Sequence, residues 1–124
     1  MTRILSLFLV TCAALSCNDI GGVCTLEARP AIDLEIRDSL TSAPIAENAV
    51  ARVLDGAFGD SLRLCRQTNT GVWISRCGPY ERAGTYDVLV MHASHQFWSV
   101  HGVRVSRDAC HVRTVTLQVR MQLP

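Results

Sequence analysis

The strongest constraint on the fold is an alternation of apolar and polar residues that repeats along most of the chain after residue 30. Ile32, Leu34 and Ile36, for example, are separated by charged residues. Successive side chains of a β-strand point to opposite faces, so a period of two is typical of a half-buried strand. The pattern predicts seven strands, over residues 31–38, 49–54, 61–66, 72–75, 85–91, 97–105 and 113–121. No window has the period of an amphipathic helix, so we expect an all-β antiparallel sandwich in a single domain.

The alternation also predicts which side chains face the core. The expected inward set is Ile32, Leu34, Ile36, Leu62, Leu64, Tyr86, Val88, Val90, Val115, Leu117, Val119 and Met121. Glycine and aspartate in residues 55–60 predict a loop, and Gly78-Pro79 predicts a break in the sheet.

The N-terminus is typical of a secretory signal peptide over residues 1–16. Arg3 supplies a positive start, an uncharged apolar run follows over residues 4–15, and small residues end it. The run is too short to span a bilayer as a helix. We therefore expect a signal peptide (1–16), an N-terminal tether (17–29) and a β-sandwich domain (30–124).

The junction Ala14-Leu15-Ser16-Cys17 resembles the bacterial lipoprotein signal, in which the cysteine becomes the lipidated first residue of the mature chain. That resemblance implies lipidation at Cys17 and a membrane contact through a lipid anchor. Ordinary cleavage near Ser16 or Cys17, giving a secreted protein, is the alternative. Either route places the protein outside the cytoplasm, in a bacterial cell envelope or beyond it.

Export into an oxidising compartment predicts that the remaining cysteines form disulfides. Cys65 and Cys77 are equally distant from Gly71 in a turn-forming segment, so we expect them to face each other across a hairpin. Cys24 and Cys110 then pair by elimination. The cysteine spacings do not match the patterns of zinc sites.

Two stretches follow short patterns of a known family. The first is Pro30-Ala31-Ile32-x-Leu34-x-Ile36-x-Asp38, followed by Thr41-x-x-Pro44-Ile45-Ala46-x-x-Ala49; the second is Ala83-Gly84-Thr85-Tyr86-x-Val88-x-Val90. Together they resemble carboxypeptidase regulatory-like domains. Ser42 stands where this family usually has a turn glycine. The resemblance implies a seven-stranded Greek-key sandwich of the transthyretin (prealbumin) type. It also implies a structural or accessory role without a catalytic apparatus.

One motif suggests an enzyme instead. Gly59-Asp60-Ser61-Leu62 resembles the nucleophile block of the GDSL esterases, and Asp108 and His111 lie in a D-x-x-H sequence as that family's triad does. The chain is too short for that family's α/β fold, and its G-x-N-D oxyanion-hole block is missing. We therefore expect a non-catalytic protein, with a small serine esterase using Ser61 as an alternative.

Three further groups of side chains are candidates for binding. His92, His95 and His101 would make a metal-binding envelope protein the other alternative. Trp73, Phe97 and Trp98 are candidates for an aromatic platform for sugar or peptide, although aromatic residues in so small a sandwich more often complete the core. Asp55 and Asp60 provide too few oxygen ligands for calcium, and we expect no cofactor.

Charge excludes one class of partner. The chain has 12 basic and 11 acidic residues, and removal of residues 1–16 takes away one arginine and no acid. A neutral mature domain lacks the basic surface that nucleic-acid binding requires, so we expect no nucleic-acid partner. The expected function is that of a structural module or one that binds a protein or carbohydrate.

Overall fold

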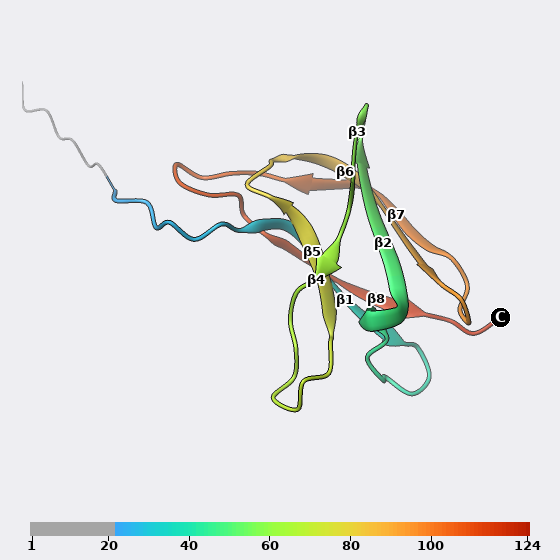
Figure 1. Cartoon of the computed structure of the whole chain (residues 1–124). Coiled ribbons are helices and arrows are strands. Elements are labelled where there is room, and N and C mark those ends of the chain that lie inside the picture. Colours follow the sequence, from blue (N-terminus) through green and yellow to red (C-terminus); the bar gives the residue numbers. More distant parts are fainter. Residues whose placement is uncertain (1–21) are drawn as a thin grey trace, which may run out of the picture.

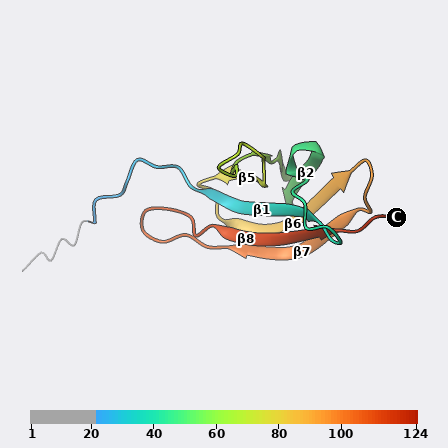
Figure 2. The ribbon, with the colours of Figure 1, turned by 90° about the horizontal axis from the view of Figure 1, so that it is seen from below.

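The computed structural model describes residues 22–124, which form a sandwich of two four-stranded sheets (Figures 1 and 2). The first sheet has the order β4-β5-β1-β8 and the second has the order β3-β2-β6-β7. A single 3₁₀ turn, η1, precedes β2. The elements are β1 (Pro30–Asp38), η1 (Ala46–Asn48), β2 (Ala49–Asp55), β3 (Phe58–Ser61), β4 (Arg63–Leu64), β5 (Ser75–Tyr80), β6 (Gly84–His92), β7 (Trp98–Val105) and β8 (Val115–Met121).

The expected signal peptide (1–16) and the lipidation residue Cys17 lie outside the described residues. Within residues 22–124, the structure contains no helix with the length and hydrophobicity needed to cross a membrane.

The structure has eight strands where the sequence predicts seven, because the predicted strand 61–66 divides at Leu62. β3 belongs to the second sheet and β4 to the first. Leu62 lies between them with its side chain buried, and its N–H donates to the Ala51 carbonyl of the second sheet. The predicted loop at 55–60 was also wrong, since Phe58 pairs with Asp55 and begins β3.

Two further predictions about the sheets were wrong. β1 and β8 are parallel, with Asp38 opposite Met121; the sheets are therefore not wholly antiparallel. Gly78-Pro79, which was predicted to break the sheet, lies inside β5. β5 begins at Ser75, the last residue of the segment 72–75 that was predicted as a strand. Proline is tolerated there because pairing with β4 reaches only Cys77, and beyond it β5 has a free edge where a missing N–H costs no ladder bond.

The core follows the predicted alternation closely. Ile32, Leu34 and Ile36 of β1 and their facing residues on β6, Tyr86, Val88 and Val90, have no exposed surface. Val119 and Met121 are buried, whereas Val115 and Leu117 are only partly buried.

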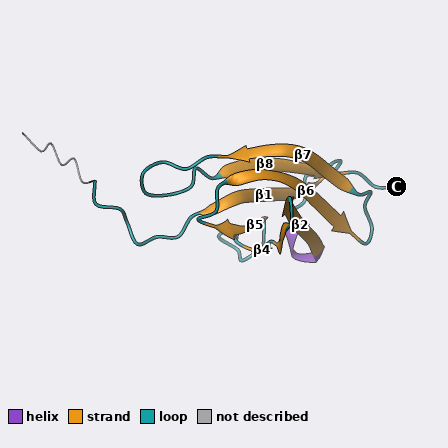
Figure 3. Ribbon diagram, turned by 90° about the horizontal axis from the view of Figure 1, so that it is seen from above, coloured by secondary structure: helices purple, strands orange, loops and turns teal. Residues whose placement is uncertain are grey.

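The sandwich has two ends with different contents. The tether end carries the N-terminal segment 22–29, the start of β1 and the β7–β8 loop; the distal end carries Asp38, the β6–β7 loop (residues 93–97) and the C-terminal residues 122–124 (Figures 2 and 3). β1 has nine residues and connects the two ends. At about 3.3 Å per residue, they lie roughly 25–30 Å apart.

Candidate functional site

Two disulfides join Cys24 to Cys110 and Cys65 to Cys77, the two pairs expected from the sequence. They are compatible with an exported protein in an oxidising environment. The expected hairpin register was wrong by two residues, however. Cys77 lies opposite Arg63, and the N–H of Cys65 donates to the Ser75 carbonyl. The two cysteines are therefore diagonal neighbours, with a Cα–Cα distance of 5.6 Å that still permits the bond.

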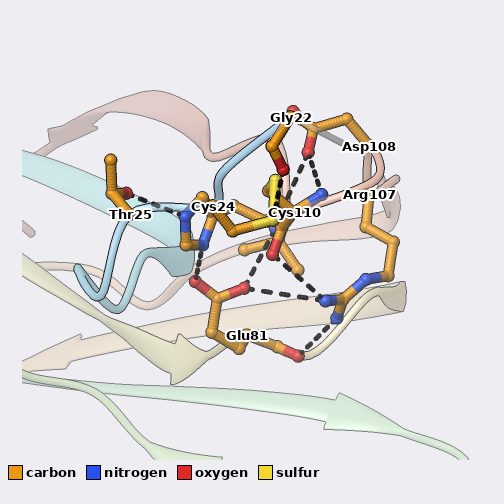
Figure 4. Close-up of a disulfide and its surroundings, with 9 residues drawn as sticks. Gly22, Cys24, Thr25, Glu81, Arg107, Asp108 and Cys110 are labelled. Atoms are coloured by element: carbon orange, nitrogen blue, oxygen red, sulfur yellow. Dashed lines mark hydrogen bonds and ion pairs between the residues drawn. A yellow bond between two sulfur atoms is a disulfide. The ribbon is translucent and has the colours of Figure 1, made fainter. Parts of the chain in front are cut away.

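At the tether end, Glu81 holds the N-terminal segment against the domain (Figure 4). Its Oε1 accepts the backbone N–H of Arg29 at 2.8 Å and the Nδ1 of His111 lies 2.7 Å from the same oxygen. The other ring nitrogen of His111, Nε2, lies 3.0 Å from the Thr25 hydroxyl. The Arg29 N–H, above all, keeps the pKa of Glu81 below its ordinary value. These bonds surround the Cys24–Cys110 disulfide, so this end has a structural role.

The three residues of the suggested esterase triad, Ser61, His111 and Asp108, are bonded to other partners. Both ring nitrogens of His111 are engaged, with Glu81 and Thr25. Asp108 Oδ1 accepts hydrogen bonds from the backbone N–H groups of Cys110 and His111. The backbone N–H of Ser61 donates to Asp60 on an exposed strand of the second sheet. Neither of the two side-chain hydrogen bonds that a catalytic triad requires, from serine to histidine and from histidine to aspartate, is formed among these described residues.

At the distal end, Asp38 organises the turn that follows β1. Its Oδ1 accepts the N–H groups of Leu40 and Thr41 and the Thr41 hydroxyl, at 2.8–3.0 Å. The Thr41 N–H, followed by the bond to His95, holds the pKa of Asp38 well below its usual range. Ser42 in the same turn has φ 59°, the left-handed conformation that a glycine favours at this position.

The second carboxylate oxygen of Asp38 binds a pair of histidines from the β6–β7 hairpin. His95 Nε2 lies 2.8 Å from Asp38 Oδ2, and the two side chains are only 6% and 8% exposed. His95 Nδ1 lies 3.0 Å from His92 Nδ1, which also accepts the N–H of Ser94 at 3.2 Å. We call Asp38, His95 and His92 the distal cluster. Burial chiefly, and the neighbouring His95 secondarily, lower the pKa of His92.

The side chains considered as alternative metal ligands do not come together as a set. His101 is 74% exposed on β7 and pairs with Asp87, outside the distal cluster. Asp55 pairs with Arg82, and Asp60 binds the Ser61 N–H. Across residues 22–124, the structure contains no group of three or more histidine, cysteine or acidic side chains arranged to hold a metal ion.

Beside the distal cluster, the surface has a hollow of about 240 Å³. It is lined by Gln96, Phe97, Trp98, Arg120, Met121 and Gln122. Phe97 is 59% exposed, and among the described residues Arg120 has no carboxylate within ion-pair distance. Trp73, the third residue of the expected aromatic platform, lies instead beside Gln67 in the β4–β5 loop.

No protein-family model matches the chain, and no curated protein matches it. We therefore infer the function of the protein from the geometry of the described residues.

Phe97, Trp98, His92 and His95 were candidates from the sequence alone, whereas Asp38, the partner of His95, was missed. The available signal was the run Asp38-Ser39-Leu40-Thr41, which is typical of an aspartate that accepts backbone N–H groups in a turn.

Proposed function

We propose that this protein is a non-catalytic, exported β-sandwich module that is held through its N-terminal segment and binds a saccharide at its distal end. The observation that carries the proposal is the hollow beside Phe97 and Trp98, at the end of the sandwich opposite the Cys24–Cys110 disulfide. An attachment through the N-terminal segment leaves that end facing away from the attachment point.

The side chains lining the hollow suit a saccharide. Aromatic rings offer flat apolar faces to the C–H groups of a sugar ring, while planar amides and a guanidinium bond its hydroxyl groups. The hollow provides Phe97 and Trp98 for the first kind of contact and Gln96, Gln122 and Arg120 for the second. Its volume of about 240 Å³ is below the usual range for drug-sized ligands and favours one or two sugar units.

We further propose a lipid anchor at Cys17 and a location in a bacterial cell envelope. Support comes from the lipoprotein-like junction before Cys17 and from Cys24, which is bonded to the domain a few residues later. A lipid at Cys17 would keep the tether end close to a membrane.

For the fold, we propose the Greek-key topology of the transthyretin type and kinship with carboxypeptidase regulatory-like domains. β3 and β4 are separated by Leu62 alone, so the chain passes directly from one sheet to the other at this residue. The turn at Asp38–Thr41 and the buried Tyr86 occupy the positions on which the resemblance depends.

Phe97→Ala tests the saccharide site. It removes the most exposed aromatic surface of the hollow, and we expect the affinity for the bound saccharide to fall about tenfold, corresponding to about 1.4 kcal/mol of lost contact. The measurement is a fluorescence titration of the oxidised protein against a panel of neutral and acidic oligosaccharides.

Tyr80→Ala is the matched control, because Tyr80 is a similarly exposed aromatic residue at the tether end. It should leave the affinity unchanged. Equal losses in both variants, or binding of extended peptides but of no saccharide, would refute the proposed ligand class.

A further inference from the structure

We propose that Asp38, His95 and His92 form a proton-operated latch, which holds the β6–β7 loop in place at neutral pH and releases it on acidification. The loop provides Gln96 and Phe97 to the hollow, so the latch would control ligand binding. In that last respect the inference rests on the proposed function. The latch itself follows from the geometry of the distal cluster.

The latch joins three parts of the chain that are distant in sequence. His95 bridges Asp38 at the end of β1 and His92 at the end of β6. The next residue, Gln96, donates its backbone N–H to the Gln122 carbonyl at 2.7 Å and its side-chain amide to the Leu123 carbonyl at 3.3 Å. Release of His95 would therefore loosen the loop on the side where it lines the hollow.

The hydrogen bonds determine where the protons lie. Asp38 is ionised and accepts, so His95 Nε2 must carry a proton and donate. His92 Nδ1 accepts the Ser94 N–H and is therefore unprotonated. The Nδ1 of His95 lies 3.0 Å from this atom, so one proton between the two Nδ1 atoms completes the bond. His92 is accordingly neutral, with its proton on Nε2.

A second proton breaks this arrangement. If His92 Nδ1 is protonated, it meets the N–H of His95 and the N–H of Ser94 with no acceptor among the three groups. Burial and the neighbouring His95 lower the pKa of His92, as expected for a group whose protonation the fold opposes.

The surrounding charges leave the pair isolated. From β1, Asp38 contacts His95, while Arg37 is bonded to Glu35 and to the Ser42 carbonyl. On the β8 side, Arg120 is bonded to the Ser42 hydroxyl. Next to β2, Glu47 is exposed in η1, two residues before Ala49, which pairs with His92. Among these described charged groups, only Asp38 belongs to the bonded cluster.

The direction of the pH effect follows from the lowered pKa of His92. The unfolded chain binds more protons than the folded chain between the lowered pKa and the ordinary histidine value of about 6.5. The contribution of the latch is therefore complete above about pH 6.5 and is lost as the pH falls through the lowered pKa of His92.

The test is nuclear magnetic resonance of the oxidised protein between pH 8 and pH 4. At pH 7 we expect the imidazole nitrogen shifts of a neutral ring at His92. As His92 takes up its proton below pH 6.5, the backbone amide of Gln96 should lose its hydrogen-exchange protection with the same midpoint. A protonated Nδ1 on His92 at pH 7, or protonation of His92 without a change at Gln96, would overturn the latch.

His92→Asn separates titration from structure. The Asn carbonyl oxygen can accept from His95 and Ser94 where Nδ1 did, but it does not take up a proton in this range. We expect Gln96 to stay protected down to pH 4 in this variant. His101→Gln is the matched control, since His101 is an exposed histidine on the same hairpin; it should retain the transition. Loss of the transition in His101→Gln, or its persistence in His92→Asn, would contradict the assignment.

Ligand binding is measured separately on the same proteins. The parent protein should lose at least tenfold in saccharide affinity between pH 7 and pH 4.5, and His92→Asn should not. If Gln96 responds to pH as expected but no saccharide binds at any pH, the latch stands and the proposed function fails. If a saccharide binds equally at both pH values while Gln96 opens, control of the hollow by the latch is refuted.

Discussion

Replacing Cys24 and Cys110 together by alanine lowers the free energy of unfolding by about 4 kcal/mol. The two cysteines are 86 residues apart, and on the chain-entropy model a loop of this length restricts the unfolded chain strongly. The measurement is denaturant unfolding at pH 7 with the Cys65–Cys77 bond intact. Segment 22–29 is exposed throughout, so most of the effect should come from the unfolded state.

The other disulfide provides the comparison. Cys65 and Cys77 are only 12 residues apart, and their joint replacement should cost about 3 kcal/mol on the same model. A larger loss from the shorter loop would mean that native packing, and not loop closure, dominates the role of the disulfides.

Leu34→Ala should lower the free energy of unfolding by about 3 kcal/mol. Leu34 is fully buried on β1, which lies between β5 and β8 at the centre of its sheet, so its removal leaves a cavity that neighbouring strands cannot easily fill. Urea denaturation of the oxidised protein measures the change.

Leu40→Ala is the control for Leu34→Ala, because the same truncation at a side chain that is 79% exposed should change stability by no more than about 0.5 kcal/mol. Similar losses at the two positions would contradict the assignment of the core.

Much of the fold was predictable because burial follows the local alternation. The alternation predicted the inner face of β1 from Ile32, Leu34 and Ile36. It predicted the inner face of β6 from Tyr86, Val88 and Val90, and all six side chains are buried. The two disulfide pairs were also accessible from spacing and elimination.

The errors occurred where long-range pairing overrides the local pattern. Leu62 carries an unbroken alternation, yet the chain changes sheet there because the adjacent residues pair with β2 on one side and with β5 on the other. The parallel pairing of β1 with β8 is equally invisible, since each strand alone has the same period in either direction.

The site was only half predictable for the same reason. His92 and His95 are three residues apart and were visible as a pair, but their partner Asp38 is 57 residues from His95. The Asp38 carboxylate reaches the His95 imidazole because β6 pairs with β2 and the β6–β7 loop then lies at the end of β1. Phe97 and Trp98 likewise acquire Arg120 as a neighbour through the fold.

The measurement that tests the account most directly is a map of backbone amide shifts while the oxidised protein is titrated with the tightest saccharide of the panel. We expect the affected amides to be confined to residues 96–98 and 120–122 at the distal end. Shifts centred on Asp60 and Ser61, or at the tether end around Glu81 and His111, would contradict it.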